Sequence, residues 1–264
     1  MNTSSTKERR SLILSILETG EAISVTRLSQ QLGISEVTIR KDLTELQRRN
    51  LVVRTRGGAI RVPKTAAGED TKIEDKRLYN IREKQAIGRM AASLIHNGDT
   101  ILLDSGTTTL EVAKNLDRLL QLTVITNSMD IALELLHYNR FTIILLGGHV
   151  RQTSHSSVGP LAEATLKNFY CDKLFLGIDS FNMEDGISTP NIEEAHLNQN
   201  MIDMSKEVIA VCDSSKFNRR SFAFIAPVSK LTAVVTDNAI ERDIKLKLQD
   251  QGVQIYIADS GRHH

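Results

Sequence analysis

Seven runs of nearly continuous apolar residues follow residue 99, and segments with helical spacing lie between several of them. Such runs are typical of strands that are covered on both faces of a mainly parallel sheet. The alternation of strand and helix therefore predicts an α/β domain with crossover helices. The expected strands are 100–103, 122–126, 141–146, 173–178, 208–212, 231–236 and 253–258, and expected helices include 84–95, 110–120 and 160–169.

The first 62 residues follow a different pattern, in which three short helices precede a hairpin. Ser24 and Ser35 are suited to cap the second and third helices, and Gly33 to end the second in a left-handed turn. Two helices joined by a glycine turn, followed by a hairpin, predict a winged helix-turn-helix. The expected helices are 12–17, 25–32 and 35–49, and the hairpin strands are 51–55 and 59–62.

The third helix has one apolar and one polar side. Ile39, Leu43 and Leu46 are spaced i, i+4 and i+7 and face inward, which leaves the polar N-terminal half free to enter a major groove. Arginines of the hairpin are placed to meet phosphates. The expected DNA-binding residues are Ser35, Glu36, Thr38, Arg40, Lys41, Arg54, Arg56 and Arg61. A small helical bundle with solvated charges is the alternative.

Charge divides the chain in the same place. The net charge is only +1, yet residues 1–62 hold 11 basic and 6 acidic side chains, against 22 and 26 in the remainder. A basic module tethered to an acidic body is typical of a phosphate-binding unit attached to a separate domain. We expect a DNA-binding domain at 1–62, a linker at 63–74 and an effector domain at 75–264.

Several classes of protein are disfavoured by composition. No apolar run approaches the roughly 18 residues that would span a bilayer, and no cleavable signal is evident, so we expect a cytoplasmic protein without a membrane partner. Cys171 and Cys212 lie far apart in apolar stretches, as buried thiols do in a reducing compartment. No Cys/His spacing predicts a metal.

The segment 104–109 (Asp104, Ser105, Gly106, Thr107, Thr108, Thr109) joins a predicted strand to a helix. Free backbone N–H groups and hydroxyls at a helix N-terminus favour an anion. The segment lacks the Gly-Lys pair of a P-loop and the three glycines of a dinucleotide fingerprint, so no cofactor is expected. Helix capping without any ligand is the alternative.

Polar residues and glycines also gather after other predicted strands. Ligands of open parallel sheets bind at the carboxyl ends of the strands, so these residues predict a site for a small polyhydroxylated anion. They are Thr126, Asn127, Gly147, Gly148, Asp179 and Lys216, together with Glu194 from a helix after Gly186. A solvated helix face is the alternative reading for Glu194.

Both halves resemble the DeoR family of transcription regulators. The DNA-binding half carries Arg9, Ile13 and Leu17, then S-x-x-T-I-R-K-D-L at 35–43 and R-G-G-A at 56–59. The effector half carries DSGTTT at 104–109, TNS at 126–128, GG at 147–148, GID at 177–179 and DSSKF at 213–217. The segment 191–201 is similar to that of AgaR-like amino-sugar regulators.

The resemblance implies a Rossmann-like effector domain similar in fold to ribose-5-phosphate isomerase, and a repressor of a carbohydrate operon. It also implies operator DNA as partner, a phosphorylated sugar such as N-acetylgalactosamine-6-phosphate as effector, and a homo-oligomer (dimer or tetramer).

An isomerase on the same scaffold is the rival hypothesis. Asp179, Glu194 and Lys216 could supply the base and the stabilising groups that sugar isomerisation needs. The isomerases that the fold resembles keep a second acid where this chain has Asn182, and a glycine run where only Gly186 appears. We therefore expect no catalytic residues and no enzymatic turnover.

Overall fold

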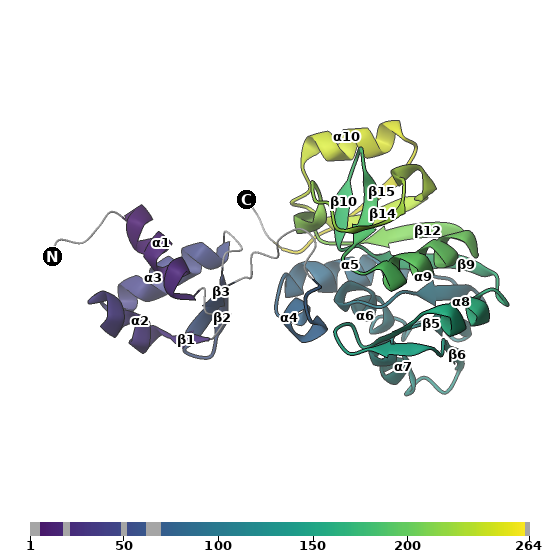
Figure 1. Cartoon of the computed structure of the whole chain (residues 1–264), viewed down its shortest axis with the longest axis horizontal. Helices are drawn as coiled ribbons and strands as arrows, with labels where there is room; N and C mark the ends of the chain where they lie inside the picture. The colour runs from purple at the N-terminus through teal and green to yellow at the C-terminus, as the bar shows by residue number, and fades with distance from the viewer. Residues whose placement is uncertain (1–5, 18–21, 49–51, 62–69, 262–264) are drawn as a thin grey trace. The chain divides into compact units, whose positions relative to one another are not determined.

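The computed structural model forms two compact units, residues 1–65 and 66–264 (Figure 1). It describes residues 6–17, 22–48, 52–61 and 70–261. Each unit has its own buried apolar core within those residues.

The first unit is a helix-turn-helix with a three-stranded sheet. Its elements are α1 (Thr6–Ile16), β1 (Ile23–Ser24), α2 (Val25–Leu32), α3 (Glu36–Arg48), β2 (Val52–Thr55) and β3 (Gly58–Arg61). Ser24 caps α2 by accepting a hydrogen bond from Arg27 N at 3.1 Å, and Gly33 ends it with φ of 64°. Ser35 accepts from Thr38 N at 3.4 Å at the start of α3. These local predictions are confirmed.

The short strand β1 was not predicted. It pairs with β3 in the sheet order β1-β3-β2. A Cβ on Gly58 would lie 2.3 Å from the carbonyl oxygen of Ile23, so only glycine allows this close approach. Gly57, the first of the two wing glycines, thus lies in a turn with open space around it. Gly58, the second, is needed for close packing.

The centre of the second unit is a seven-stranded parallel sheet in the order β15-β14-β12-β9-β4-β5-β6. Its strands are β4 (Thr100–Leu103), β5 (Leu122–Thr126), β6 (Phe141–Leu145), β9 (Cys171–Gly177), β12 (Ser205–Val211), β14 (Ala233–Asp237) and β15 (Gln254–Ala258). All seven predicted strands therefore exist, and 100–103 and 122–126 have the predicted bounds. The α/β class and the mainly parallel sheet are confirmed.

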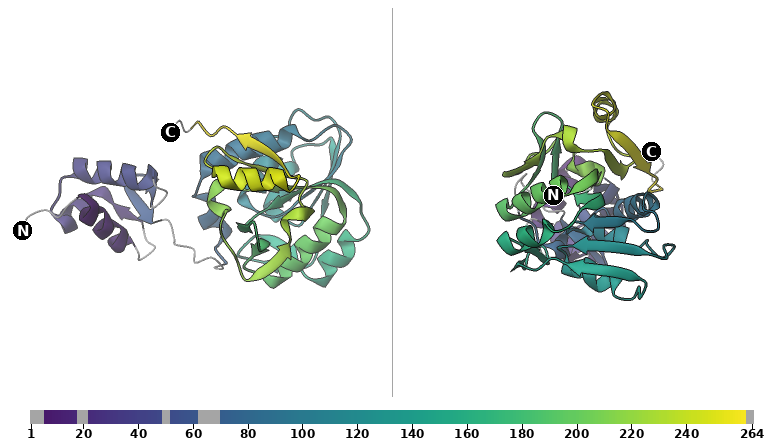
Figure 2. Two further views of the ribbon diagram at one scale, coloured as in Figure 1. Left: turned by 90° about the horizontal axis from the view of Figure 1, so that it is seen from above. Right: turned by 90° about the vertical axis from the view of Figure 1, so that its right-hand side faces the viewer.

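Alternate residues of each central strand enter different cores. In β4, Ile101 and Leu103 pack into the core beneath α5 (Ile81–Ser93), α6 (Thr107–Ala113) and α7 (Met129–Leu135). Leu102 packs into the core beneath α8 (Pro160–Leu166), α9 (Ile192–Asp203) and α10 (Arg242–Asp250). Figure 2 shows the sheet between these helices. Because both faces are buried, the strands lack polar alternation.

Two small sheets border the carboxyl edge of the main sheet. The hairpin β7 (His149–Arg151) and β8 (Ser156–Val158) follows β6, and β10 (Ser180–Asn182), β11 (Gly186–Thr189) and β13 (Ala223–Ala226) form a second sheet. Neither was predicted from the sequence.

The predicted linker 63–74 needs one correction. Residues 63–69 lie outside the described part of the chain, but residues 70–74 belong to the second unit. Ile73 is buried, starts α4 (Ile73–Arg77), and donates its N–H to the carbonyl of Thr153 at 2.7 Å. The linker was predicted from its polar composition, which does not show that buried Ile73 and the charged side chains of this segment anchor it.

Candidate functional site

The topological switch point of the sheet lies between β4 and β9. The chain leaves β4 toward β5 and β6 on one side, and later leaves β9 toward β12 on the other. Ligands of such sheets bind in the region beyond the carboxyl ends of the strands at the switch point. Asp104 directly follows β4, and Asp179 follows β9 by two residues. The five strand ends that the sequence singled out are adjacent in the sheet.

The turn 104–109 leads from β4 into α6. Gly106 has φ of 149°, and the hydroxyl of Thr109 donates to its carbonyl at 3.0 Å. The first N–H groups of α6, beginning at Thr107, have no acceptor within the helix because the helix begins there. Thr107, Thr108 and Thr109 are all buried.

Nine ionisable side chains cluster around this switch point. Five are carboxyl groups and four are cations, and each interacts electrostatically with at least one other member. The cluster consists of Asp70, Asp104, Asp179, Glu194, Asp213, Lys76, Lys84, Arg151 and Lys216. Buried charged groups are stable only when they are paired. The ionisable side chains at these strand ends must therefore make charged or polar contacts.

Asp179 is the ionised centre of the cluster. Its Oδ1 lies 2.6 Å from Nζ of Lys76, and its Oδ2 lies 3.2 Å from the hydroxyl of Thr189. Burial alone would raise the pKa of Asp179, but Lys76 and Lys216 outweigh it and lower that pKa to about 2. Asp179 is therefore a permanent hydrogen-bond acceptor at neutral pH.

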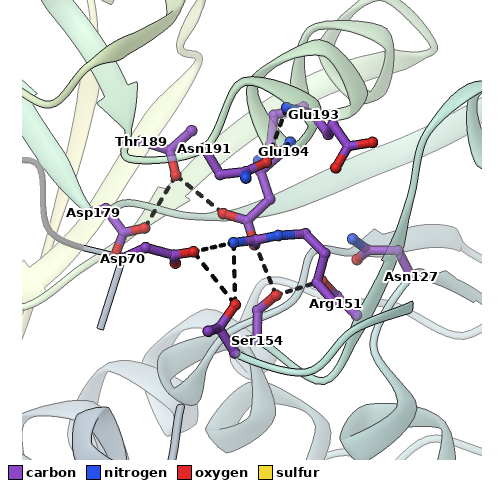
Figure 3. Close-up of polar contacts among 12 residues, drawn as sticks. Asp70, Asn127, Arg151, Ser154, Asp179, Thr189, Asn191, Glu193 and Glu194 are labelled. Atoms are coloured by element: carbon purple, nitrogen blue, oxygen red, sulfur yellow. Dashed lines mark hydrogen bonds and ion pairs between the residues drawn. The ribbon is translucent and has the colours of Figure 1, made fainter. Parts of the chain in front are cut away.

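Arg151 pairs with two carboxylates, those of Glu194 on α9 and Asp70 (Figure 3). Its side chain is 6% exposed, and it also donates to the hydroxyl of Ser154 at 3.1 Å. Burial raises the pKa of Glu194 despite the nearby guanidinium. Thr189 lies 3.2 Å from both Glu194 and Asp179, so it links the two acids. Glu194 is therefore not on a solvated face.

Asp104 has the opposite electrostatic character. Burial, reinforced by the carboxylate of Glu194, raises the pKa of Asp104 to about 8. Its Oδ2 accepts a hydrogen bond from Nδ2 of Asn198 at 3.1 Å. Burial also lowers the pKa of Lys84 to about 8. The site thus holds a largely protonated carboxyl beside an ionised one at neutral pH.

Of the remaining predicted effector residues, Thr126 and Gly148 serve the fold itself. The hydroxyl of Thr126 is used within the fold, because it donates to the carbonyl of Leu103 at 2.7 Å and accepts from Ser128 N at 3.0 Å. A Cβ on Gly148 would lie 2.5 Å from the carbonyl oxygen of Val158, so its role is close packing, whereas Gly147 is exposed.

Asn127 differs because one of its polar atoms has no partner. Nδ2 donates to the carbonyl of Ser157 at 3.3 Å, which fixes the orientation of the amide. Oδ1 is buried and has no hydrogen-bond partner among the described residues. Its side chain extends toward Arg151 in Figure 3. Such an unsatisfied acceptor is costly unless a ligand or water supplies a donor.

Sequence reasoning missed six members of the site: Asp70, Lys76, Lys84, Arg151, Asn198 and Asp213, the last of which stands in the DSSKF motif but was not predicted to bind the effector. Asn198 had a usable signal, because it lies four residues after Glu194 and so on the same helix face. Lys84 begins the expected helix 84–95, and nothing in its spacing marked it. Asp70 and Lys76 stand in or beside the expected linker.

The expected DNA-reading helix presents its polar half as predicted. Glu36 accepts hydrogen bonds from the hydroxyl of Thr26 at 2.6 Å and from Arg40 at 3.1 Å. The side chain of Arg40 is 52% exposed, and Lys41 is also exposed. Ser35 and Thr38 share a hydrogen bond at 3.0 Å.

The wing arginines are not equivalent. Arg56 is exposed at the turn, whereas Arg54 donates to the carbonyl of Arg40 at 3.3 Å and has a buried Nε. Arg54 thus supports α3 and is less available for phosphates than predicted. The side chain of Arg61 lies outside the described part of the structure.

The cluster at the switch point is suited to bind a polyhydroxylated anion. Carboxylates and the Asn127 oxygen accept hydrogen bonds from hydroxyl groups, while lysines and helix N–H groups offer donors to an anion. Within the described residues, no group of three or more His, Cys, Asp and Glu side chains is arranged to hold a metal ion.

Comparison with known families assigns both units. The model of the DeoR C-terminal sensor domain matches residues 79–238, and that of the DeoR-like helix-turn-helix domain matches residues 9–65. In the described part of the chain, no helix is long and apolar enough to cross a membrane.

Two relatives align over nearly the whole chain. A protein of Escherichia coli O157:H7, named as a transcriptional repressor of the aga operon, is 36% identical over 96% of this chain and 94% of its own length. The transcriptional repressor AccR of Agrobacterium fabrum is 38% identical over 89% of this chain and 90% of its own. Among solved structures, ribose 5-phosphate isomerase A of Methanocaldococcus jannaschii matches 51% of this chain and 53% of its own, with 16% identity and a TM-score of 0.38.

Proposed function

Because this chain belongs to the DeoR family, we propose that it is a transcriptional repressor of a carbohydrate operon, controlled by a phosphorylated sugar. The observation that carries the proposal is the charged cluster at the switch point, in a chain that also holds a helix-turn-helix. The names of the two relatives support repression, and the proposed link to amino sugars rests on the likeness of residues 191–201 to AgaR-like regulators.

The effector we propose is a hexose or hexosamine phosphate such as N-acetylgalactosamine-6-phosphate. Its hydroxyl groups would donate to Asp179 and to Oδ1 of Asn127, the two acceptors described above. Its phosphate would accept from the N–H groups at the start of α6 and pair with cations of the cluster, which are Lys84 or Lys216 together with Arg151.

The DNA-binding half acts through α3 in the major groove, with Arg40 and Lys41 as its exposed cations. A homo-oligomer, dimer or tetramer, would hold two such helices over paired half-sites. Effector binding shifts the equilibrium between arrangements that fit and do not fit this spacing, and the expected result is derepression. Since its target is chromosomal, we place the protein in the cytoplasm.

We propose no enzymatic activity. The acids of the cluster are held by ion pairs and by Thr189, and the distant likeness to an isomerase carries no mechanism. An assay of the purified protein with ribose-5-phosphate and hexosamine phosphates tests this directly. Measurable turnover would favour the isomerase hypothesis instead.

The experiment for the sensing function is a thermal-shift screen of phosphorylated and free hexoses and hexosamines. A ligand at about 100 times its Kd stabilises the native state by about 2.7 kcal/mol. For a unit of this size the Tm would rise by roughly 5–10 °C. We expect the rise with a phosphorylated sugar and not with its free sugar or with inorganic phosphate. Equal Tm values throughout would exclude the sensing function.

A further inference from the structure

A short segment ahead of α5 is tied to the charged cluster by two ion pairs. We call residues 70–77 the strap. Asp70, at its start, pairs with the guanidinium of Arg151. Lys76, near its end, lies 2.6 Å from Oδ1 of Asp179. Both partners belong to the candidate effector site, so the strap forms part of that site.

Weaker contacts hold the strap between these two points. Ile73 is buried and donates its N–H to the carbonyl of Thr153 at 2.7 Å. Glu74 lies 2.9 Å from Nε2 of His155, and this carboxylate is half exposed. Since Thr153 and His155 are in the turn between β7 and β8, the strap rests on the hairpin that carries Arg151.

The strap also has a distinctive place in the chain. The helix-turn-helix match ends at residue 65 and the sensor match begins at residue 79, so neither family model includes it. Only residues 62–69 separate Asp70 from the end of β3. Asp70 is thus the first described residue of the second unit after the DNA-binding unit.

Charge balance indicates which contact an anionic ligand would break. Arg151 already neutralises two carboxylates, and an entering phosphate would add a third anion beside one cation. Uncompensated charge at a buried site is strongly unfavourable. The side chain of Glu194 is 12% exposed and fixed on α9, whereas that of Asp70 is 38% exposed. Asp70 is thus the carboxylate that can return to water most easily.

We propose that the strap is a movable wall of the effector site: an anionic sugar replaces Asp70 as a partner of Arg151 and thereby frees the chain that leads to the DNA-binding unit. This inference rests on the proposed function and adds to it the contact by which the ligand is sensed. In this mechanism Arg151 can pair with the ligand or with Asp70 of the strap, but not with both. The ligand therefore interacts differently with the attached and the released state, as coupling between two sites requires.

The test is the full-length variant Asp70→Asn, which keeps the side chain's size and removes its charge. Without ligand, we expect its affinity for a duplex selected from a random library by the wild-type protein to fall at least fivefold. Its affinity for N-acetylgalactosamine-6-phosphate, or for the hexosamine phosphate that stabilises the wild type, should rise by a similar factor, because the ligand no longer competes with the Asp70 carboxylate for Arg151. Asp250→Asn, at the exposed end of α10, is the matched control and should change neither.

Opposite changes in the two affinities cannot arise from misfolding, which weakens both. If Asp70→Asn behaves as Asp250→Asn does while the wild type responds to a sugar phosphate, the strap inference is wrong and the proposed function stands. If no sugar phosphate binds the wild type, the proposed sensing fails, and the operator affinity of Asp70→Asn alone decides whether the strap controls DNA binding.

Hydrogen exchange of the wild type provides a second measurement that needs no variant. Addition of the stabilising sugar phosphate should speed exchange of the Ile73 amide, whose hydrogen bond to Thr153 fixes the strap. Unchanged or slower exchange at Ile73, with the ligand bound, would overturn the release mechanism.

Discussion

Asn198 donates a hydrogen bond from its Nδ2 to Oδ2 of Asp104 across 3.1 Å, although 94 residues separate the two in the chain. The contact joins α9 to the end of β4. It also places an amide donor on a carboxyl group whose burial raises its pKa to about 8. Asp104 therefore remains largely protonated at neutral pH in the folded protein but ionises when the chain unfolds.

This difference predicts how stability depends on pH. Between the ordinary pKa of 3.8 and about 8, the folded state holds a proton on Asp104 that the unfolded state has lost. The stabilising contribution is complete below the unfolded pKa, and it is lost as the pH rises through the folded pKa. Asp104→Asn should therefore reduce the fall in free energy of unfolding between about pH 4 and about pH 8.

The measurement is urea unfolding of the wild type and the variant across that range. Asp250→Asn, which alters an exposed carboxyl group, should keep the wild-type slope. A slope unaffected by Asp104→Asn would mean that Asp104 is ionised in the folded protein.

Thr108 offers a direct test of the turn 104–109. Thr108→Val keeps the shape of a buried side chain at the start of α6 and removes its hydroxyl. A hydrogen bond to a charged group contributes about 1.5–3 kcal/mol, so the affinity for a sugar phosphate should fall roughly ten- to hundredfold. Operator affinity without ligand should not change.

Isothermal titration with the sugar phosphate measures the loss, and Thr165→Val on α8, a half-buried threonine whose hydroxyl donates to the carbonyl of Leu161, is the control. An unaltered sugar-phosphate affinity in Thr108→Val would remove the turn from the effector site.

The strands of the main sheet were predictable because burial of both faces leaves an unmistakable apolar run. β4 and β5 have the predicted bounds. The helix-turn-helix was predictable for a different reason, since Ser24, Gly33 and Ser35 act through contacts within a few residues. Both kinds of signal are local in sequence.

The small sheets and the ion pairs could not be predicted in this way. All three residues of β8 are buried, yet Ser156 and Ser157 are polar, and their burial depends on hydrogen bonds to distant groups such as the carbonyl of Leu146. Arg151 likewise acquires its role from Asp70 and Glu194, which are 81 and 43 residues away. Pairing at such separations is decided by the tertiary fold.

Asn127 tests the acceptor side of the effector site. Asn127→Leu replaces the buried, unpartnered Oδ1 by an apolar group of similar size. Relief of the desolvation penalty offsets loss of the 3.3 Å bond to Ser157, so the free energy of unfolding should stay within about 1 kcal/mol of the wild type. The affinity for the sugar phosphate should fall by up to about tenfold because one hydrogen bond is lost.

Chemical denaturation and ligand titration of the same preparation separate the two effects, with Asn168→Leu in the exposed turn after α8 as the control. A large loss of stability with normal ligand affinity would show that Asn127 serves the fold instead of the effector.

Arg40 and Lys41 distinguish base reading from phosphate contact on α3. The ion pair of Arg40 with Glu36 is exposed and has i, i+4 spacing, so it is weak and does not prevent Arg40 from turning to a base. If Arg40 reads a base, Arg40→Ala should weaken binding to the selected duplex by about 1–3 kcal/mol and relax preference at one position.

If Lys41 contacts a phosphate, Lys41→Ala should weaken binding to all sequences and reduce the salt slope by about 1. Fluorescence anisotropy over a salt series measures both, with Gln47→Ala, exposed later on the same helix, as the control. Equal losses on selected and random duplexes in Arg40→Ala would move Arg40 to the phosphate-contacting class, and no loss would remove it from the DNA-binding face.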